Sequence, residues 1–251
     1  GIAIDKHFIS SIEDKISTYL PDYLLVSPKA DISIENLLSM RSGLGQIEKN
    51  ISTSLKFIKS KDWLKHIFDL PMQFKPDEKF EYNTANAHVL SAVITRSTGM
   101  SSSKFAEEYL FAPLGIKEYV WETDPKGNAF GGGNLFLKPN DMARIGYLLL
   151  NNGFWDGKEV ISSDWIKRSF DRITNWDYGF FYGYLWYIKD FEHQMQKIVT
   201  YSAAGAGGQQ IWIIPEYNMV IVVTSEANLI GDKSYYLNLM MNNYLTSWIE
   251  R

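Results

Sequence analysis

The sequence predicts an α+β fold. The apolar residues of the first half recur at helical spacing, whereas after about residue 175 they gather in short runs rich in β-branched and aromatic residues. Helices first, then an antiparallel meander, then one closing helix is the order typical of an α+β protein. No Pro-, Gly- or Ser-rich linker interrupts the chain, so we expect a single domain.

The expected helices of the first half have recognisable ends. Apolar residues at four-residue spacing from Ile12 to Leu20 predict a helix that Pro21 stops. Ser33 is a good N-cap for the next short helix, which we expect to end at Gly43.

A longer helix is expected around residues 89–94. Asn83 or Thr84 can form its N-cap, and Gly99 is suited to its C-cap. Further helix starts and stops are expected at Ser101, at Pro139 with Asp141 beside it, and at Asn152-Gly153.

The second half is expected to form strands over 181–188, 198–202, 210–214 and 219–224. Residues 215–218 contain Pro, Glu and Asn between two of these runs, which indicates a hairpin turn. An amphipathic helix over 234–248 is expected to close the chain.

Composition excludes several classes of protein. The 251 residues contain no cysteine, which removes disulfides, cysteine-ligated zinc, iron–sulfur clusters and thiol nucleophiles. The formal charge of −4 argues against a nucleic-acid-binding protein, which normally carries a basic stripe. The longest apolar stretches fall far short of the roughly 20 residues that cross a bilayer, so we expect no transmembrane segment.

Most motifs that could carry chemistry are absent or have an ordinary structural explanation. No serine has glycine at both −2 and +2, and no histidine pair has zincin spacing, so neither a nucleophile elbow nor a metal site is predicted. The four histidines are expected to be packing or surface residues. Gly131-Gly132-Gly133 lacks the strand and helix that flank a phosphate loop, and we predict no cofactor.

Two further patterns are ambiguous. Lysines alternate with apolar residues over 56–65, which is more typical of an amphipathic helix with a solvated face than of a membrane anchor. The aromatic cluster at 176–187 could line a pocket for an apolar ligand, although packing within strands is the more common role.

Two short segments are not fully explained by structure alone. Residues 80–84 read Phe-Glu-Tyr-Asn-Thr, and helix capping accounts for Asn83 or Thr84 but not for Tyr82. In residues 201–208, every side chain after Tyr201 is small, and such a run at the end of a strand lets the backbone approach a ligand closely. Outward-facing amide groups there could hold an oxyanion.

Together these segments resemble the serine β-lactamase-like hydrolases, which include class C β-lactamases, D-alanyl-D-alanine peptidases, related esterases and 6-aminohexanoate-dimer hydrolases. The likeness covers nearly the whole chain in the order of the family. The matching segments are residues 34–44, 80–84, 113–116, 132–135, 141–144, 153–158 and 205–215.

The resemblance implies a β-lactamase/transpeptidase-like fold, with an antiparallel sheet flanked by helices and a helical subdomain beside it. It implies a single domain over 1–251, with the helical subdomain at about 30–130 and the sheet-containing subdomain at about 1–29 and 131–251. The family's nucleophile is the serine of a Ser-x-x-Lys motif, expected about ten residues before the segment that matches residues 1–6. We therefore expect 1–251 to be an N-terminally truncated fragment without the first strands, with an exposed sheet edge and poor solubility.

One internal segment imitates the motif. Residues Ser101 to Lys104 have Ser-x-x-Lys spacing, but they follow Thr98-Gly99-Met100, where family members start a surface helix. We therefore interpret Ser101 as a helix cap.

The resemblance also implies site residues. Tyr82 matches the family's catalytic tyrosine, which works with the absent lysine because a tyrosine with a pKa near 10 is a poor base unless a cation stabilises its phenolate. The Ala206 amide is the candidate oxyanion donor. Residues expected to bind the substrate or border the groove are Thr84, Gly132, Gly133, Asn134, Ser202 and Gly205.

The predicted function is a serine hydrolase that acts through an acyl-enzyme on a small ester or amide. Ala203-Ala204-Gly205 stands where lactamases carry Lys-Thr-Gly, so a carboxylesterase or an aminohexanoate-dimer-type amidase is favoured. The alternatives are a β-lactamase or D-alanyl-D-alanine peptidase, and a non-catalytic binding protein that keeps the groove. The chain alone is expected to be inactive, and the sequence settles neither oligomeric state nor localisation.

Overall fold

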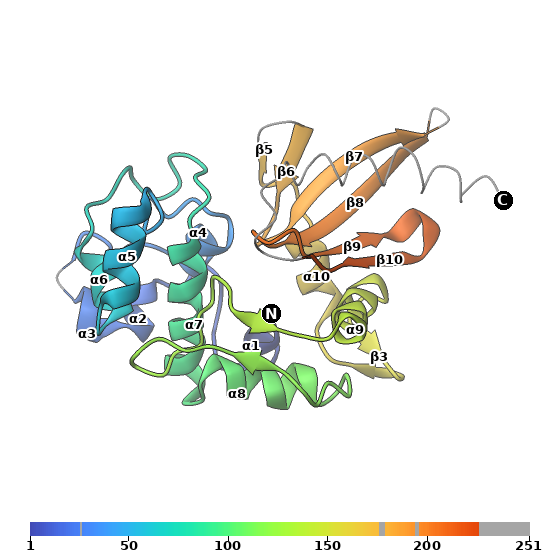
Figure 1. Cartoon of the computed structure of the whole chain (residues 1–251), viewed down its shortest axis with the longest axis horizontal. Helices are drawn as coiled ribbons and strands as arrows, with labels where there is room; N and C mark the ends of the chain where they lie inside the picture. The colour runs from blue at the N-terminus through green and yellow to red at the C-terminus, as the bar shows by residue number, and fades with distance from the viewer. Residues whose placement is uncertain (26, 176–178, 194–195, 226–251) are drawn as a thin grey trace.

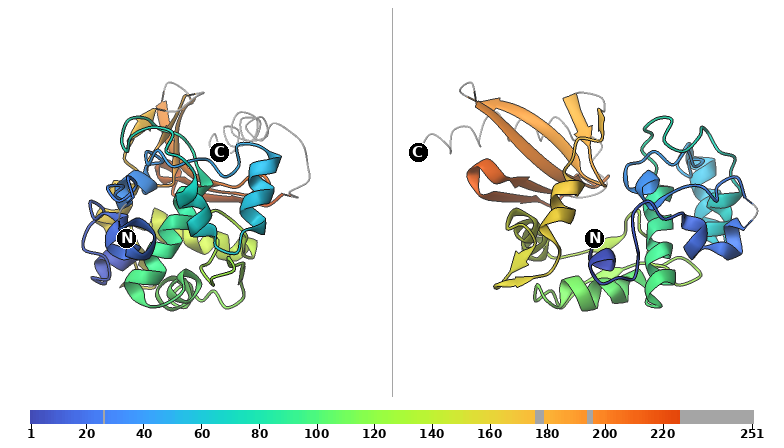
Figure 2. Two further views of the ribbon diagram at one scale, coloured as in Figure 1. Left: turned by 90° about the vertical axis from the view of Figure 1, so that its left-hand side faces the viewer. Right: turned by 180° about the vertical axis from the view of Figure 1, so that it is seen from behind.

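A computed structural model describes residues 1–225, except for residues 26, 176–178 and 194–195. Helices α2 to α7 gather on one side of the molecule and a six-stranded antiparallel sheet stands on the other, as Figures 1 and 2 show. The structure thus confirms the α+β class.

The elements follow one another along the chain with these bounds. The helical part contains α1 (Ile2–Asp5), α2 (Ile16–Tyr19), α3 (Pro21–Leu24), α4 (Ile34–Leu38), α5 (Ile51–Lys59), α6 (Trp63–Asp69), α7 (Thr84–Thr98) and α8 (Ser102–Ala106), which continues into a π-helical turn at Glu107–Phe111. Then come β1 (Val120–Trp121), β2 (Leu135–Phe136), α9 (Pro139–Leu150), β3 (Phe154–Trp155), β4 (Lys158–Glu159) and α10 (Ser163–Ser169). The sheet is formed by β5 (Thr174–Asn175), β6 (Phe180–Tyr182), β7 (Tyr187–His193), β8 (Gln196–Ala204), β9 (Gln210–Ile214) and β10 (Met219–Val223), with a 3-10 turn at Pro215–Tyr217 before β10.

Local capping chemistry places the helix starts where the sequence predicts them. Ser33 caps α4 in a reciprocal pair with Asn36, and Asn83 caps α7 by accepting the Ala85 amide. Gly99 ends α7 in the left-handed conformation, with φ of 71°.

The prediction of one helix from Ile12 to Leu20 is wrong. Only Ile16–Tyr19 is helical, and Pro21 begins α3 rather than merely ending a helix. Ile12, Ile16 and Leu20 are nevertheless all buried, so their spacing reflects contact with the core and not a continuous helix. A proline is well tolerated at a first helical position, where its missing N–H is not needed.

The sheet has the strand order β10-β9-β8-β7-β6-β5, and every neighbouring pair is antiparallel. The hairpin predicted around residues 215–218 is present, with Asn218 in the left-handed conformation. Helix α9 packs against β9 and β10 at Gly146, where a Cβ atom would lie 2.5 Å from a methyl group of Val220.

The prediction of one strand over 181–188 is wrong, because a tight turn divides it into β6 and β7. Gly183 N donates to the Trp186 carbonyl, and Leu185 adopts a left-handed φ of 63°. The turn docks on α4: Leu185 N donates to the Leu38 carbonyl at 3.1 Å, and the Tyr184 hydroxyl donates to the Glu35 carboxylate. Docking therefore joins the sheet to the helical side.

The helix expected over 234–248 lies outside the described residues. Within the described ranges, no helix combines the length and the apolar character needed to cross a bilayer.

The docking of the β6–β7 turn can be tested with Tyr184→Phe. Tyr184 is buried, and the substitution removes the hydroxyl that donates to the Glu35 carboxylate. This loss is expected to lower the free energy of unfolding by about 1.5–3 kcal/mol. Urea denaturation followed by fluorescence measures the change. Tyr217→Phe is the matched control, expected to change stability by less than about 0.5 kcal/mol because Tyr217 is only partly buried. Equal stability of wild type and Tyr184→Phe would contradict the docking role.

Candidate active site

Tyr82 lies immediately before α7 and is held by contacts on both sides. Glu81 N donates to the Met40 carbonyl at 2.9 Å, and the side chain of Asn83 donates to the carbonyl groups of Leu44 and Gly45. The Tyr82 carbonyl itself accepts from Gln46 Nε2 at 3.4 Å. These bonds fix the backbone at Tyr82, whose side chain keeps 41% of its surface exposed.

The phenol of Tyr82 meets two tyrosines of the sheet. Its ring centroid lies 6.4 Å from that of Tyr182 and 6.4 Å from that of Tyr187. A hydrogen bond joins the hydroxyls of Tyr82 and Tyr187, and it lowers the pKa of Tyr82 while raising that of Tyr187. Either hydroxyl can donate in this pair, because each neutral phenol has one O–H and acceptor lone pairs.

The surroundings of Tyr82 keep its phenol neutral. Burial raises its pKa, the nearby Glu48 carboxylate raises it further, and the hydrogen bond with Tyr187 only partly offsets these effects. Neither Glu48 nor Tyr187 is a cation. Since a free tyrosine already has a pKa near 10, Tyr82 can serve as a base at neutral pH only when a further positive charge stabilises its phenolate.

Strand pairing brings Ser202 to the same place. Tyr187 of β7 stands opposite Ser202 of β8, which in turn stands opposite Trp212 of β9. Side chains of directly opposed residues lie on the same face of a sheet, so the buried Ser202 lies beside the tyrosine that contacts Tyr82.

The loop of small residues leaves the sheet two residues after Ser202. Gly205 N donates to the Gln209 carbonyl and Gly208 N donates to the Gly205 carbonyl, which closes the β8–β9 connection. Among the described residues the Ala206 amide has no hydrogen-bond acceptor, and Ala206 is exposed. Its role as an oxyanion donor stays a prediction.

Thr84 and the glycine loop form the other side of this region. A Cβ atom on Gly132 would lie 2.0 Å from the Thr84 methyl group, and one on Gly131 would lie 2.0 Å from the Ala87 carbonyl oxygen. The absence of side chains thus lets the loop rest directly on the first turn of α7. Gly133 follows in the same turn, through a bond from its amide to the Phe130 carbonyl.

Asn134 is arranged differently from the expected groove residue. It adopts a left-handed φ of 56°, and its side-chain amide donates to Glu122 at 2.6 Å. Its amide group is therefore engaged by Glu122 rather than by Tyr82 or Thr84, and a role in substrate binding stays a prediction.

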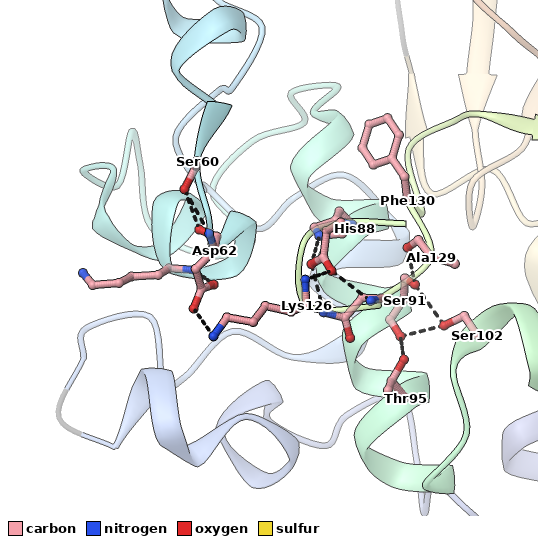
Figure 3. Close-up of polar contacts among 12 residues, drawn as sticks. Ser60, Asp62, His88, Ser91, Thr95, Ser102, Lys126, Ala129 and Phe130 are labelled. Carbon is pink, nitrogen blue, oxygen red and sulfur yellow. Dashed lines mark hydrogen bonds and ion pairs between the residues drawn. The ribbon is translucent and has the colours of Figure 1, made fainter. Parts of the chain in front are cut away.

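A buried network under the glycine loop holds the loop on α7 (Figure 3). His88 Nε2 lies 3.2 Å from Asp124 Oδ2, and both side chains are fully buried. Burial alone would raise the pKa of Asp124, but hydrogen bonds from His88 and Asn128 outweigh it and lower the pKa. Ser91 Oγ donates to the Ala129 carbonyl at 2.6 Å, which secures the next residue of the segment. His88 thus acts in packing, as the sequence predicts.

The Ser-x-x-Lys segment at Ser101 belongs elsewhere. Ser101 Oγ accepts the Lys104 amide as the N-cap of α8, and Lys104 pairs with Glu107 at 3.3 Å. Helix α8 follows the C-terminal end of α7, about 22 Å along that helix from Tyr82 at 1.5 Å per residue. The structure supports the interpretation of Ser101 as a cap.

Sequence reasoning missed four residues that surround Tyr82 from outside its own segment, one of which is Tyr182. Tyr187 was grouped with strand-packing aromatics, and neither Gln46 nor Glu48 was singled out. No local signal marked Tyr187, because the turn at Leu185 was itself not predicted and the register of β7 against β8 is known only from the structure.

Comparisons with known proteins show the family of the chain. The sequence model of the beta-lactamase family matches residues 9–234. A 6-aminohexanoate-dimer hydrolase of Paenarthrobacter ureafaciens is 28% identical over 158 residues, which cover 59% of this chain and 39% of that protein. An uncharacterised protein of Alkalihalophilus pseudofirmus is 22% identical over 61% of this chain and 54% of its own length. The chain thus matches about two fifths to about half the length of these curated relatives.

Solved structures share the fold. A Bacillus anthracis protein, provisionally named a 6-aminohexanoate-dimer hydrolase, has a TM-score of 0.80 at 19% identity and covers 99% of this chain and 69% of its own. A D-stereospecific amidohydrolase from a Streptomyces species has a TM-score of 0.72 at 14% identity, covering 95% of this chain and 81% of its own.

The contact between Thr84 and Gly132 predicts a coupled pair of substitutions. Gly132→Ala places a methyl group in the space of the Thr84 methyl and is expected to cost about 1–3 kcal/mol of stability. Thr84→Ser removes that methyl, so Gly132→Ala should cost less in its background. Denaturant unfolding of the four variants measures the coupling. Gly133→Ala is the matched control, because Gly133 does not have a positive φ and its added Cβ atom would have no neighbour closer than 3.6 Å. Strict additivity would contradict the contact.

The hydrogen bond between Tyr187 and Tyr82 predicts a shift in the titration of Tyr82. In Tyr187→Phe this bond is lost, and since the bond lowers the pKa of Tyr82, that pKa is expected to rise further. NMR of ¹³Cζ-labelled tyrosine, with the Tyr82 signal assigned by Tyr82→Phe, measures it. Tyr217→Phe serves as the control and should leave that signal unmoved. An unchanged or lower Tyr82 pKa in Tyr187→Phe would mean that the bond does not stabilise the phenolate.

Proposed function

Because the chain belongs to the beta-lactamase family, whose sequence model matches residues 9–234, we propose that it forms the Tyr82 side of a serine hydrolase that acts on an ester or amide through an acyl-enzyme. The observation that carries the proposal is the contact of Tyr82, just before α7, with Tyr187 of the sheet, which stands opposite Ser202 in the neighbouring strand.

Each residue has a part in the proposed reaction. A serine oxygen attacks the carbonyl carbon while the Tyr82 phenolate accepts the serine proton, and Tyr82 then protonates the departing alcohol or amine. The Ala206 amide donates to the oxyanion of the tetrahedral intermediate. Water then attacks the acyl-serine ester by the same route in reverse, which releases the acid and restores the serine. Thr84 and Ser202 offer hydroxyls to the substrate.

The nucleophile is the part that we do not assign within residues 1–251. Ser101 caps α8, and Ser42 is buried with its hydroxyl donating to Asn86 at 2.6 Å. Tyr82 also lacks a cation among the groups that shift its pKa. We therefore propose that residues 1–251 alone do not catalyse hydrolysis and that a Ser-x-x-Lys segment supplies both the nucleophile and the positive charge.

The substrate class is inferred from the sheet end. Ala203-Ala204-Gly205 presents neither a cation nor a hydroxyl to a substrate carboxylate, which disfavours β-lactams and peptides with a free carboxylate. The names of two similar proteins, a 6-aminohexanoate-dimer hydrolase and a D-stereospecific amidohydrolase, support amides as substrates. A third, a hydrolase with promiscuous acyltransferase activity, supports acyl transfer.

Inactivity of the chain alone is tested by covalent labelling. Residues 1–251 should give no adduct with a fluorophosphonate probe and no hydrolysis of nitrophenyl acyl esters or a chromogenic cephalosporin. Mass spectrometry of the digested protein locates any adduct. An adduct on a serine of this chain, with turnover, would overturn the proposal.

The catalytic role of Tyr82 is tested in any longer product of the same gene that carries Ser-x-x-Lys. Nitrophenyl esters should be hydrolysed faster than the cephalosporin, and Tyr82→Phe should lower kcat/KM by about 10²–10⁴-fold. Tyr217→Phe is the control and should retain activity. A folded product that hydrolyses neither substrate would overturn the enzyme assignment for these substrates. A gene without the motif would instead indicate a binding protein.

A further inference from the structure

Helix α5 exposes three large apolar side chains to solvent. Ile51, Leu55 and Ile58 keep 81%, 48% and 60% of their surface exposed. Their spacing of four and three residues places them in one stripe along the helix. We define these three side chains as the α5 stripe.

The stripe is not a core face that failed to find a partner. Helix α5 packs against the protein through Phe57, which is buried and lies with its ring tilted against that of Trp63, the ring centroids 4.4 Å apart. At about 100° per residue, Phe57 lies about 120° around the helix from the centre of the stripe. The helix therefore packs on the protein through the face that carries Phe57, and the α5 stripe is a second apolar face that is open to solvent.

The conformation of the stripe does not depend on burial. Asn50 and Thr53 form a reciprocal capping box at the start of α5, with both backbone-to-side-chain bonds at 3.0 Å. Capping holds the first turn in place while Ile51 stays in solvent.

Lysines are concentrated in and next to α5. Residues 49–65 contain five lysines and one acidic residue, a formal charge of +4, in a chain whose total is −4. Lys65 pairs with Asp69, but the other four form no ion pair within the described part of the chain. Those four, all exposed, are Lys49, Lys56, Lys59 and Lys61.

We propose that α5 is a docking surface for an anionic lipid bilayer, lying parallel to the membrane with the α5 stripe inserted and the lysines at the headgroups. An apolar stripe flanked by lysines on a helix is the arrangement that binds such an interface, through buried apolar area together with attraction to anionic lipid. Charge complementarity selects this partner, because zwitterionic lipid offers nothing to the four unpaired lysines. This binding is peripheral and separate from the proposed hydrolase function.

The sequence pattern alone favoured the opposite interpretation, an ordinary amphipathic helix with a solvated polar face. In the structure, Phe57 packs inward, whereas Ile58, also in the lysine-rich stretch, is turned out with the stripe. The proposal therefore depends on the exposure of Ile58 together with Ile51 and Leu55, which the sequence pattern does not reveal.

Vesicle sedimentation of residues 1–251 tests the proposal. Vesicles of phosphatidylcholine with about one quarter phosphatidylglycerol should retain the protein, pure phosphatidylcholine vesicles should not, and raising the salt from about 0.05 M to about 0.5 M should release it. Ile51→Ser/Leu55→Ser/Ile58→Ser should weaken partition at least tenfold. Val120→Ser/Phe136→Ser is the matched control, since both residues are about as exposed, at 60% and 59%, and lie elsewhere on β1 and β2.

Charge is tested separately. Lys56→Glu/Lys59→Glu should also weaken partition at least tenfold, whereas Lys158→Glu/Lys167→Glu, which changes the net charge equally, should have a much smaller effect. Circular dichroism and urea midpoints should match those of wild type, because every substituted residue is exposed.

Three results would overturn the proposal: no retention of wild type on anionic vesicles, equal losses in the α5 variants and their controls, or binding that is indifferent to salt. Sedimentation velocity without lipid tests the alternative that the stripe binds a second copy of the chain. A dimer of wild type that the stripe variant abolishes would assign the stripe to a second copy of the chain and not to a membrane.

Discussion

The docking of the β6–β7 turn on α4 holds the two sides of this molecule in register. One backbone hydrogen bond, from Leu185 N to the Leu38 carbonyl, and one side-chain bond, from Tyr184 to Glu35, cross the junction. Because β7 starts two residues after Leu185, the position of Tyr187 follows directly from this contact. Strand β8 pairs with β7, so the position of Ser202 opposite Tyr187 depends on the same turn.

The start of α7 provides the complementary fixed point. Asn83 uses one side chain for two purposes, since its oxygen caps the helix and its nitrogen holds the Leu44 and Gly45 carbonyls. Farther along α7, His88 and Ser91 secure the segment that leads into the glycine loop. One helix therefore positions Tyr82 at its tip and the loop along its side, and a disturbance of α7 would affect both.

Local signals in the sequence were sufficient for much of this arrangement. The caps at Ser33 and Asn83 and the stop at Gly99 depend on residues within one turn, so they could be predicted without tertiary structure. The contact between Tyr82 and Tyr187 joins residues far apart in the chain and depends on strand register, which no local pattern contains. The break at Leu185 was missed for a related reason: a leucine with positive φ is uncommon, and its docking on α4 is a tertiary effect.

The hydrogen-bonded tyrosine pair also has a consequence for proton balance. With both phenols neutral, this end of the sheet contributes no charge, and forming the Tyr82 phenolate requires a proton to leave the pair. Any cation that binds against Tyr82 and stabilises its phenolate is thus linked to proton release. Each unit of pH then changes the apparent affinity for that cation by up to about tenfold, with tighter association at higher pH as long as the cation keeps its own proton.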